Sequence, residues 1–240
     1  MSVPATEHPS HRPADPVSPL VQRLVAASGI VFGVLMLIGI ALAGDSTPEL
    51  DAPLDEWTQY ARDNEDNLRI ASLLLGLAAY NFLLFLGYLR SVMGEAERAA
   101  RGFTRGGYIV LAAGTAGIVG VVLGLGVGGL AMDPDTPPEV LRAVSQIGSG
   151  VWVLASGGLG ACLVTVGLLN AGLRALPAWL GWVALAAGLA FVLQLGTYLS
   201  EEQDNVFGIF YPIGFLLLVV FTIGASVTFL RRQAAAAPPA

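Results

Sequence analysis

Several polar side chains lie inside long apolar stretches of an otherwise hydrophobic chain, and five of them are candidates for a common site. They are Gln146, Ser149, Gln194, Tyr198 and Tyr211. Amide and hydroxyl groups at such positions can hydrogen-bond a ligand in a pocket among helices, or they can bond one helix to another. Counting 1.5 Å per residue along a helix puts all five in the same half of a membrane. They are the candidate ligand-binding residues of this chain, with interhelical hydrogen bonding as the alternative.

Several kinds of catalytic chemistry are excluded by what these stretches lack. Ser149 lies between two glycines, but a serine nucleophile needs a base, and the two histidines, His8 and His11, are in the N-terminal tail. Haem and zinc sites within the apolar stretches are excluded for the same reason, because no histidine is available there as a ligand. The one cysteine, Cys162, is expected to be a small packing residue. We therefore expect no enzymatic activity, no cofactor and no metal site.

The composition identifies the broad class of protein. Of the 240 residues, 55% are hydrophobic and only 12% are charged, and the mean hydropathy is +0.69. A soluble domain carries about a quarter charged residues, so this chain is predicted to be an integral membrane protein. The net charge of -6 and the lack of a basic stripe exclude nucleic-acid binding. All 12 basic residues are arginines, which is typical of a high-GC bacterial genome.

The elements that must position the polar residues are membrane-spanning helices. A helix of about 20 apolar residues crosses the hydrocarbon core of a bilayer. No predicted span contains Asp, Glu, Lys, Arg or His, although proton- and sodium-coupled transporters commonly place an ionisable residue there. The sequence predicts an all-α polytopic bundle of six spans: Leu24–Ala43, Ile70–Leu89, Tyr108–Ala131, Ala143–Leu169, Trp179–Leu199 and Phe207–Leu230.

The arginines predict the orientation of the bundle. Nine of them flank the spans on the side of the two termini, and three, Arg62, Arg69 and Arg142, lie on the other side. The positive-inside rule then places both termini in the cytoplasm of a multi-pass cell-membrane protein. Fourteen of the 18 acidic residues lie in the loops on the opposite, outer side.

The chain divides into a transmembrane domain and two tails. Residues 1–19, which are rich in proline, are predicted to be a disordered cytoplasmic tail, and residues 233–240 a second one. Residues 20–232 form the six-helix domain. Ala43 ends a small-x-small sequence of the kind that precedes signal cleavage. The apolar run before it exceeds the roughly 7–15 residues of a signal peptide, so we interpret it as a spanning helix, with cleavage as the alternative.

The first outer loop has room for structure of its own. Leu54, Trp57, Tyr60 and Ala61 recur at helical spacing, with acidic residues around the rest of the circumference. This pattern predicts a short amphipathic helix on the outer surface or over the mouth of the bundle. The acidic cluster lacks the spacing of an EF-hand loop, so no calcium site is assigned to it.

Glycines in the third span predict a close helix contact. Their steps of three and four residues place them on one face, which lets two backbones approach. The pair Gly29 and Gly33 in the first span has the same spacing, and such faces could equally join copies of this chain or a different subunit. The stripe in the third span consists of Gly114, Gly117, Gly120, Gly124 and Gly128.

The layout resembles a group of uncharacterised six-helix membrane proteins from high-GC bacteria. Three segments carry the resemblance: Asn67–Arg69 at the end of the acidic loop, Phe85–Arg90 at the exit of the second span, and the junction Leu176–Trp182. The resemblance covers most of the chain. It implies the six-helix architecture and brings no catalytic residues.

Two functions follow as hypotheses. The first is a non-enzymatic membrane protein that binds or moves a lipid or small apolar ligand through an outward-facing cavity lined by the five polar residues. The second is a structural or regulatory membrane subunit that packs against partner helices through its glycine faces. A membrane lipid is the expected partner in the first case, and a homo- or hetero-oligomer in the second.

Overall fold

The computed structural model describes residues 18–43, 47–49, 51–100, 105–127, 129, 133, 135–199 and 206–236. Within these residues there are helices and short connections but no strand. The fold class is confirmed as an all-α bundle of six helices, each long and apolar enough to cross a membrane. These candidate spans are Leu20–Ala43, Leu54–Ala99, Gly106–Gly126, Pro138–Leu173, Ala178–Leu199 and Val206–Ala235.

The helices begin and end where the backbone chemistry predicts. Proline, which cannot donate a backbone hydrogen bond, precedes three of them, at Pro53, Pro137 and Pro177. Arg174, with φ of 53°, ends one helix in the left-handed conformation. The elements are α1 (Pro19–Ala43), α2 (Leu54–Ala99), α3 (Gly106–Val121), η1 (Val122–Val127), α5 (Pro138–Leu173), α6 (Ala178–Gln194), η2 (Leu195–Leu199), η3 (Val206–Ile209) and α7 (Phe210–Ala236).

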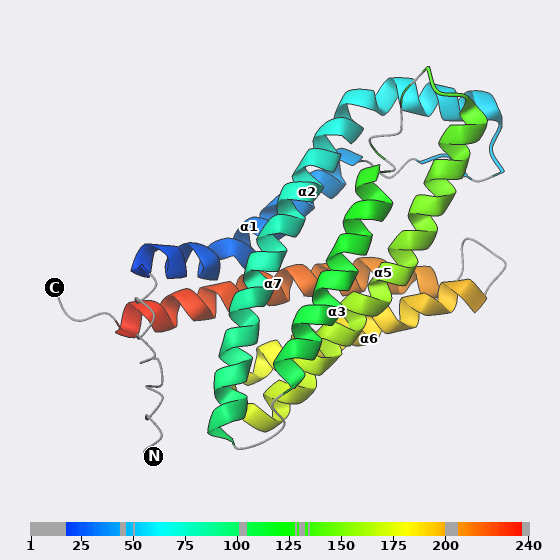
Figure 1. Ribbon diagram of the computed structural model, residues 1–240. Helices are drawn as coiled ribbons and strands as arrows, with labels where there is room; N and C mark the ends of the chain where they lie inside the picture. The colour runs from blue at the N-terminus through cyan, green and yellow to red at the C-terminus, as the bar shows by residue number, and fades with distance from the viewer. Residues whose placement is uncertain are drawn as a thin grey trace, which may run out of the picture.

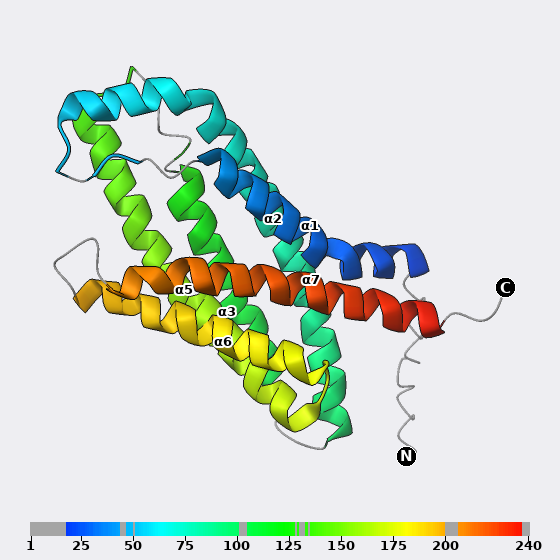
Figure 2. The same ribbon diagram turned by 180° about the vertical axis from the view of Figure 1, so that it is seen from behind.

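The six helices form a closed ring. Each packs beside the next along the chain, and α7 returns to pack against α1. In both views α6 and α7 cross the direction of α2, α3 and α5 (Figures 1 and 2). The Gln233 side chain of α7 donates to the Gln22 carbonyl of α1 at 3.3 Å, so these helices bring the two ends of the described chain to one side. Helix α7 continues to Ala236, four residues into the segment predicted to be a tail.

The separate amphipathic helix expected in the first outer loop is not confirmed. Leu54–Ala99 is one helix of 46 residues, whose first turns lie across an end of the bundle before it bends inward (Figure 1). Charged residues lower the hydropathy between the two predicted pieces but do not interrupt backbone hydrogen bonding. They also add side-chain support, because Glu65 and Arg69, one turn apart, form an ion pair.

The first turns of α2 are held by a small apolar cluster at that end. Trp57, Tyr60, Ala61 and Leu68 pack with Leu141, near the start of α5. Trp57 is 0% exposed, so it is enclosed by protein rather than anchored at a membrane surface. Sequestering these side chains from water is the main reason that a polar helical segment stays folded against the bundle.

The glycine stripe of the third span meets a neighbouring helix, as predicted. A Cβ atom added to Gly117 would lie 2.6 Å from the backbone nitrogen of Leu159, and one on Gly124 would lie 2.7 Å from the carbonyl oxygen of Gly148. Both neighbours belong to α5, so α3 and α5 are in backbone contact. Gly128 lies outside the described residues. In α1, Gly29 and Gly33 also pack against α7, Gly29 against the Thr222 carbonyl oxygen and Gly33 against the Ile223 and Val219 side chains.

Aromatic rings from α1, α2 and α7 pack into one cluster in the interior of the bundle. The ring of Phe85 is about 6 Å from those of Phe82, Phe221 and Phe229, and Phe32 lies 4.7 Å from Phe82. These side chains are essentially inaccessible. Cys162 of α5 is also buried, consistent with its interpretation as a packing residue. The aromatic cluster is therefore tightly packed, and the two pockets described below lie nearer the two ends of the bundle.

Candidate functional site

A pocket of about 320 Å³ lies toward the end of the bundle that the first turns of α2 cover. It is bounded by α1, α2, η1, α5 and α7. Apolar groups predominate on its wall, with a few hydroxyls among them. The described lining residues are Ile40, Ala43, Thr47, Tyr60, Leu68, Ala71, Ser72, Leu75, Gly124, Leu125, Gly129, Ser145, Gly148, Ser149 and Tyr211. We call this space the outer pocket, because the arginine distribution predicts that this end of the bundle faces outward.

The close contact of η1 with α5 shapes one side of the outer pocket. Gly124 and Gly148 both line it and touch each other through their backbones. Because neither residue has a side chain, backbone atoms form this part of the wall, and no side chain from these two positions fills the pocket. Gly124 belongs to η1, a π-helical stretch that follows α3. Such stretches are wider than an α-helix and often occur at functional sites.

The structure places two of the five predicted residues on the wall of the outer pocket, Ser149 and Tyr211. The Tyr211 ring meets Trp152 edge to face, with centroids 4.8 Å apart, and this contact fixes its orientation. Its hydroxyl makes no hydrogen bond to a described residue and remains available to a ligand. Ser149 is exposed, one turn of α5 from Ser145.

The other three predicted residues lie elsewhere. Gln146 is exposed on α5 and is not part of the described pocket wall. The Tyr198 hydroxyl of η2 donates to the Gly150 carbonyl of α5 at 2.5 Å, which is the interhelical bond that the alternative interpretation predicted. Gln194 is 4% exposed, and its Oε1 atom has no hydrogen-bond donor among the described residues. The five residues therefore do not converge on one site.

Several residues of the pocket wall are not among the five that the sequence predicts. Tyr60, Leu68, Ala71 and Leu75 line the outer pocket from α2. Their steps of eight, three and four residues place them on one helical face, which was the signal available in the sequence. This helical face was not recognised in the sequence, because Tyr60 was placed in a separate loop helix and the other residues in or next to the second span. Ser72, also on the wall, donates its hydroxyl to the Leu68 carbonyl at 2.8 Å.

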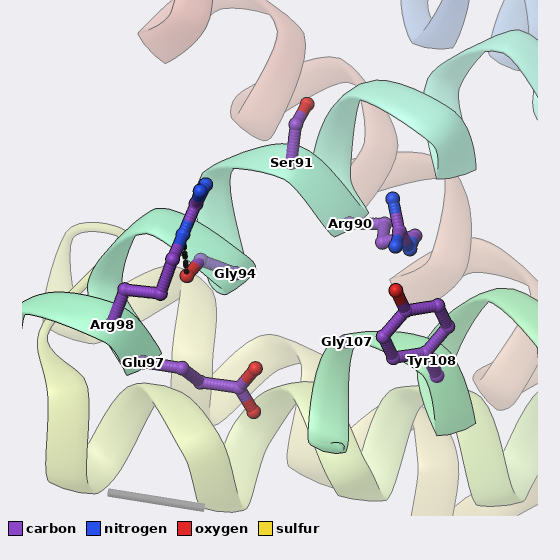
Figure 3. A pocket seen from close by; sticks show the side chains of 7 residues that line it. All are labelled: Arg90, Ser91, Gly94, Glu97, Arg98, Gly107 and Tyr108. Carbon is purple, nitrogen blue, oxygen red and sulfur yellow. Dashed lines mark hydrogen bonds between the residues drawn. The ribbon is translucent and has the colours of Figure 1, made fainter. Parts of the chain in front are cut away.

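A second, more polar pocket of about 500 Å³ lies at the opposite end of α2, beside the start of α3 (Figure 3). Glu97 is 2% exposed there, and its carboxylate accepts a hydrogen bond of 3.0 Å from the backbone nitrogen of Gly106. A carboxylate at the N-terminus of a helix satisfies a free N–H group and interacts favourably with the helix dipole. Glu97 therefore fixes the beginning of α3.

The described residues contain no group of three or more His, Cys, Asp or Glu side chains arranged to hold a metal ion. Comparisons with protein-family models, with curated proteins and with solved structures find no match to this chain. Function is therefore inferred from the geometry of the two ends of the bundle.

Proposed function

We propose that this protein is a non-enzymatic membrane protein that binds a lipid chain or another small apolar molecule in the outer pocket. The observation that supports the proposal is the pocket itself, an apolar space of about 320 Å³ beside a backbone-lined helix contact. Ligand pockets range from about 300 to 1,000 Å³. A space at the lower limit suits one acyl chain or a small apolar molecule rather than a whole two-chain lipid.

The polar groups of the outer pocket support binding with a defined orientation. Small-molecule sites are mostly apolar, with a few placed hydrogen-bonding groups. Tyr211 supplies a hydroxyl held by its contact with Trp152, and Ser149 supplies another at the rim. The described wall contains no carboxylate, imidazole, amine, guanidinium or thiol group. This favours binding over acid–base or nucleophilic chemistry.

The proposal includes an orientation. Nine of the 12 arginines flank the spans on the side where α1 begins and α7 ends. The positive-inside rule places that side in the cytoplasm. The outer pocket would then lie in the outer half of the cell membrane, beneath the first turns of α2. A ligand would enter it from outside the cell or from the outer leaflet.

The alternative is a structural or regulatory subunit that packs against partner helices. The Tyr198–Gly150 hydrogen bond takes one polar residue out of the candidate ligand set, but it lies within this chain and indicates no partner. The glycine faces of α1 and α3 are also occupied by contacts within the chain. A partner helix would therefore meet other surfaces.

The test compares two substitutions one turn apart on α5. Ser149→Leu puts a branched apolar side chain at the rim of the outer pocket, whereas Gln146→Leu adds similar bulk outside its described wall. We expect Ser149→Leu to lose the apolar molecules that co-purify with the protein, as measured by mass spectrometry, and Gln146→Leu to retain them. Equal retention by both variants would contradict the proposal.

A further inference from the structure

The polar pocket at the opposite end of α2 has features of an anion site. It is lined by Arg90, Ser91, Gly94, Glu97, Arg98, Gly107 and Tyr108. In Figure 3 the Arg90 guanidinium lies over Tyr108, Arg98 lies farther along α2, and Glu97 is directed toward the start of α3. With two arginines and one glutamate, the described lining carries one net positive charge. We call this space the inner pocket.

Arg90 is held in place but is not neutralised. Its guanidinium carbon lies 4.1 Å from the centroid of the Tyr108 ring, a cation–π contact that restricts the side chain. Its Nε atom is buried without an acceptor among the described residues. The terminal nitrogens also have no hydrogen-bond partner in this part of the chain and are left for a bound group. A guanidinium that is positioned and unpaired is suited to a phosphate or carboxylate.

The other charged groups of the inner pocket do not satisfy Arg90. Glu97 uses its Oε1 atom to accept the hydrogen bond from the Gly106 backbone nitrogen. Arg98 is exposed, and its Nε donates to the Gly94 carbonyl at 3.1 Å. Neither arginine takes part in an ion pair with a described residue, whereas Arg69, at the other end of α2, does. Arg98 therefore adds positive potential next to the unpaired guanidinium.

The depth of the inner pocket matches the headgroup region of a membrane. The apolar run of α2 ends at Leu89, one residue before Arg90, and the next candidate span starts at Gly106. Tyr108 is 60% exposed at this boundary, where amphipathic rings are favoured. Basic pockets between spanning helices at this depth can bind lipid headgroups.

We propose that the inner pocket binds the phosphodiester of a phospholipid headgroup, with Arg90 as its main ligand. The terminal nitrogens of Arg90 and the hydroxyl of Tyr108 donate hydrogen bonds to phosphate oxygens, and Arg98 contributes attraction. One net positive charge matches the single negative charge of a phosphodiester. This inference is independent of the outer pocket, which lies at the other end of the bundle.

The experiment measures binding of defined molecules to the full-length protein in detergent by native mass spectrometry. The probes are phosphatidylglycerol, diacylglycerol with the same acyl chains but no phosphate, and inorganic phosphate. We expect phosphatidylglycerol to bind more tightly than diacylglycerol. Losing charge-assisted hydrogen bonds should weaken phosphatidylglycerol binding about tenfold in Arg90→Gln. The matched control is Arg62→Gln, which removes an exposed arginine at the far end of α2 and should leave this binding unchanged.

Two further measurements identify the source of the phosphate group and check that each variant is folded. Displacement of phosphatidylglycerol by millimolar inorganic phosphate would show that the phosphate group alone occupies the inner pocket, and retention would show that the acyl chains contribute. Thermal unfolding shows whether each variant is folded. Should Arg90→Gln not fold, Arg98→Gln, at an exposed position, must weaken phosphatidylglycerol binding severalfold. Binding of diacylglycerol equal to that of phosphatidylglycerol, or wild-type binding by a folded Arg90→Gln variant, would overturn the proposal.

Discussion

The contact between Gly124 of η1 and Gly148 of α5 yields the sharpest prediction. A Cβ atom on Gly124 would lie 2.7 Å from the Gly148 carbonyl oxygen and 3.1 Å from the Trp152 backbone nitrogen. Ordinary Cβ contacts begin at about 3.4 Å, so the methyl group of Gly124→Ala is about 0.7 Å too close to that oxygen. The obstacle is backbone, which cannot rotate away as a flexible side chain could. The two helices must therefore separate.

The cost follows from how dispersion attraction falls with distance. A gap of 0.5–1 Å forfeits about a quarter to a half of each contact of roughly 0.1–0.2 kcal/mol, and tightly packed helices share many such contacts. Overpacking of well-packed interiors typically costs about 1–3 kcal/mol. We expect Gly124→Ala to lower the free energy of unfolding by about that amount, because packing is a main attraction between helices in lipid.

The matched control is Gly76→Ala on α2. A Cβ atom there would meet nothing within 4 Å. Replacing glycine by alanine favours the helical backbone by up to about 1 kcal/mol in both variants. The difference between their unfolding free energies therefore measures the cost of the close contact. Unfolding is followed by circular dichroism during titration with a denaturing detergent. A Gly124→Ala variant as stable as Gly76→Ala would refute the reasoning and show that η1 and α5 are less tightly packed than the structure indicates.

Three further predictions test individual residues and the topology. Tyr198→Phe removes the hydrogen bond to the Gly150 carbonyl and should lower the unfolding free energy by about 1 kcal/mol; an unchanged value would mean that the bond does not contribute to stability. Gln194→Leu removes a buried amide oxygen without a donor, so thermal stability should stay constant or rise, and a large loss would reveal a partner for that oxygen. Reporter fusions should place Ala240 in the cytoplasm and Asp135 outside, and an extracytoplasmic Ala240 would contradict the proposed orientation.

The six spans could be predicted from the sequence because lipid leaves the backbone few choices. Without water, N–H and C=O groups must bond within the segment, so long apolar stretches become helices. The glycine spacing of the third span likewise indicated a close contact, because Gly117 and Gly124 on one face present no side chain. It did not show that the partner is α5, since several helices could have offered a complementary surface.

The length of α2 shows that hydropathy does not predict where a helix begins outside the membrane. Charged residues between Ala61 and Ile70 separated a loop helix from a span in the sequence, yet one helix runs through both. Helical hydrogen bonds form in water as well as in lipid, so a fall in hydropathy marks the membrane boundary rather than the end of a helix. For the same reason Glu97, beyond the apolar run, was not recognised as a buried residue that caps the start of α3.

The candidate sites depended most on tertiary structure. The sequence alone determined how deep Gln146 and Ser149 lie, because a helix rises by a constant 1.5 Å per residue. It did not determine which of them faces the outer pocket, because rotation about the helix axis is set by packing against neighbours. Only the folded ring placed Ser149 and Tyr211 on the wall of one pocket, left Gln146 outside that described wall, and brought Arg90 over Tyr108. Depth is a local property of one helix, whereas convergence depends on how several helices pack together.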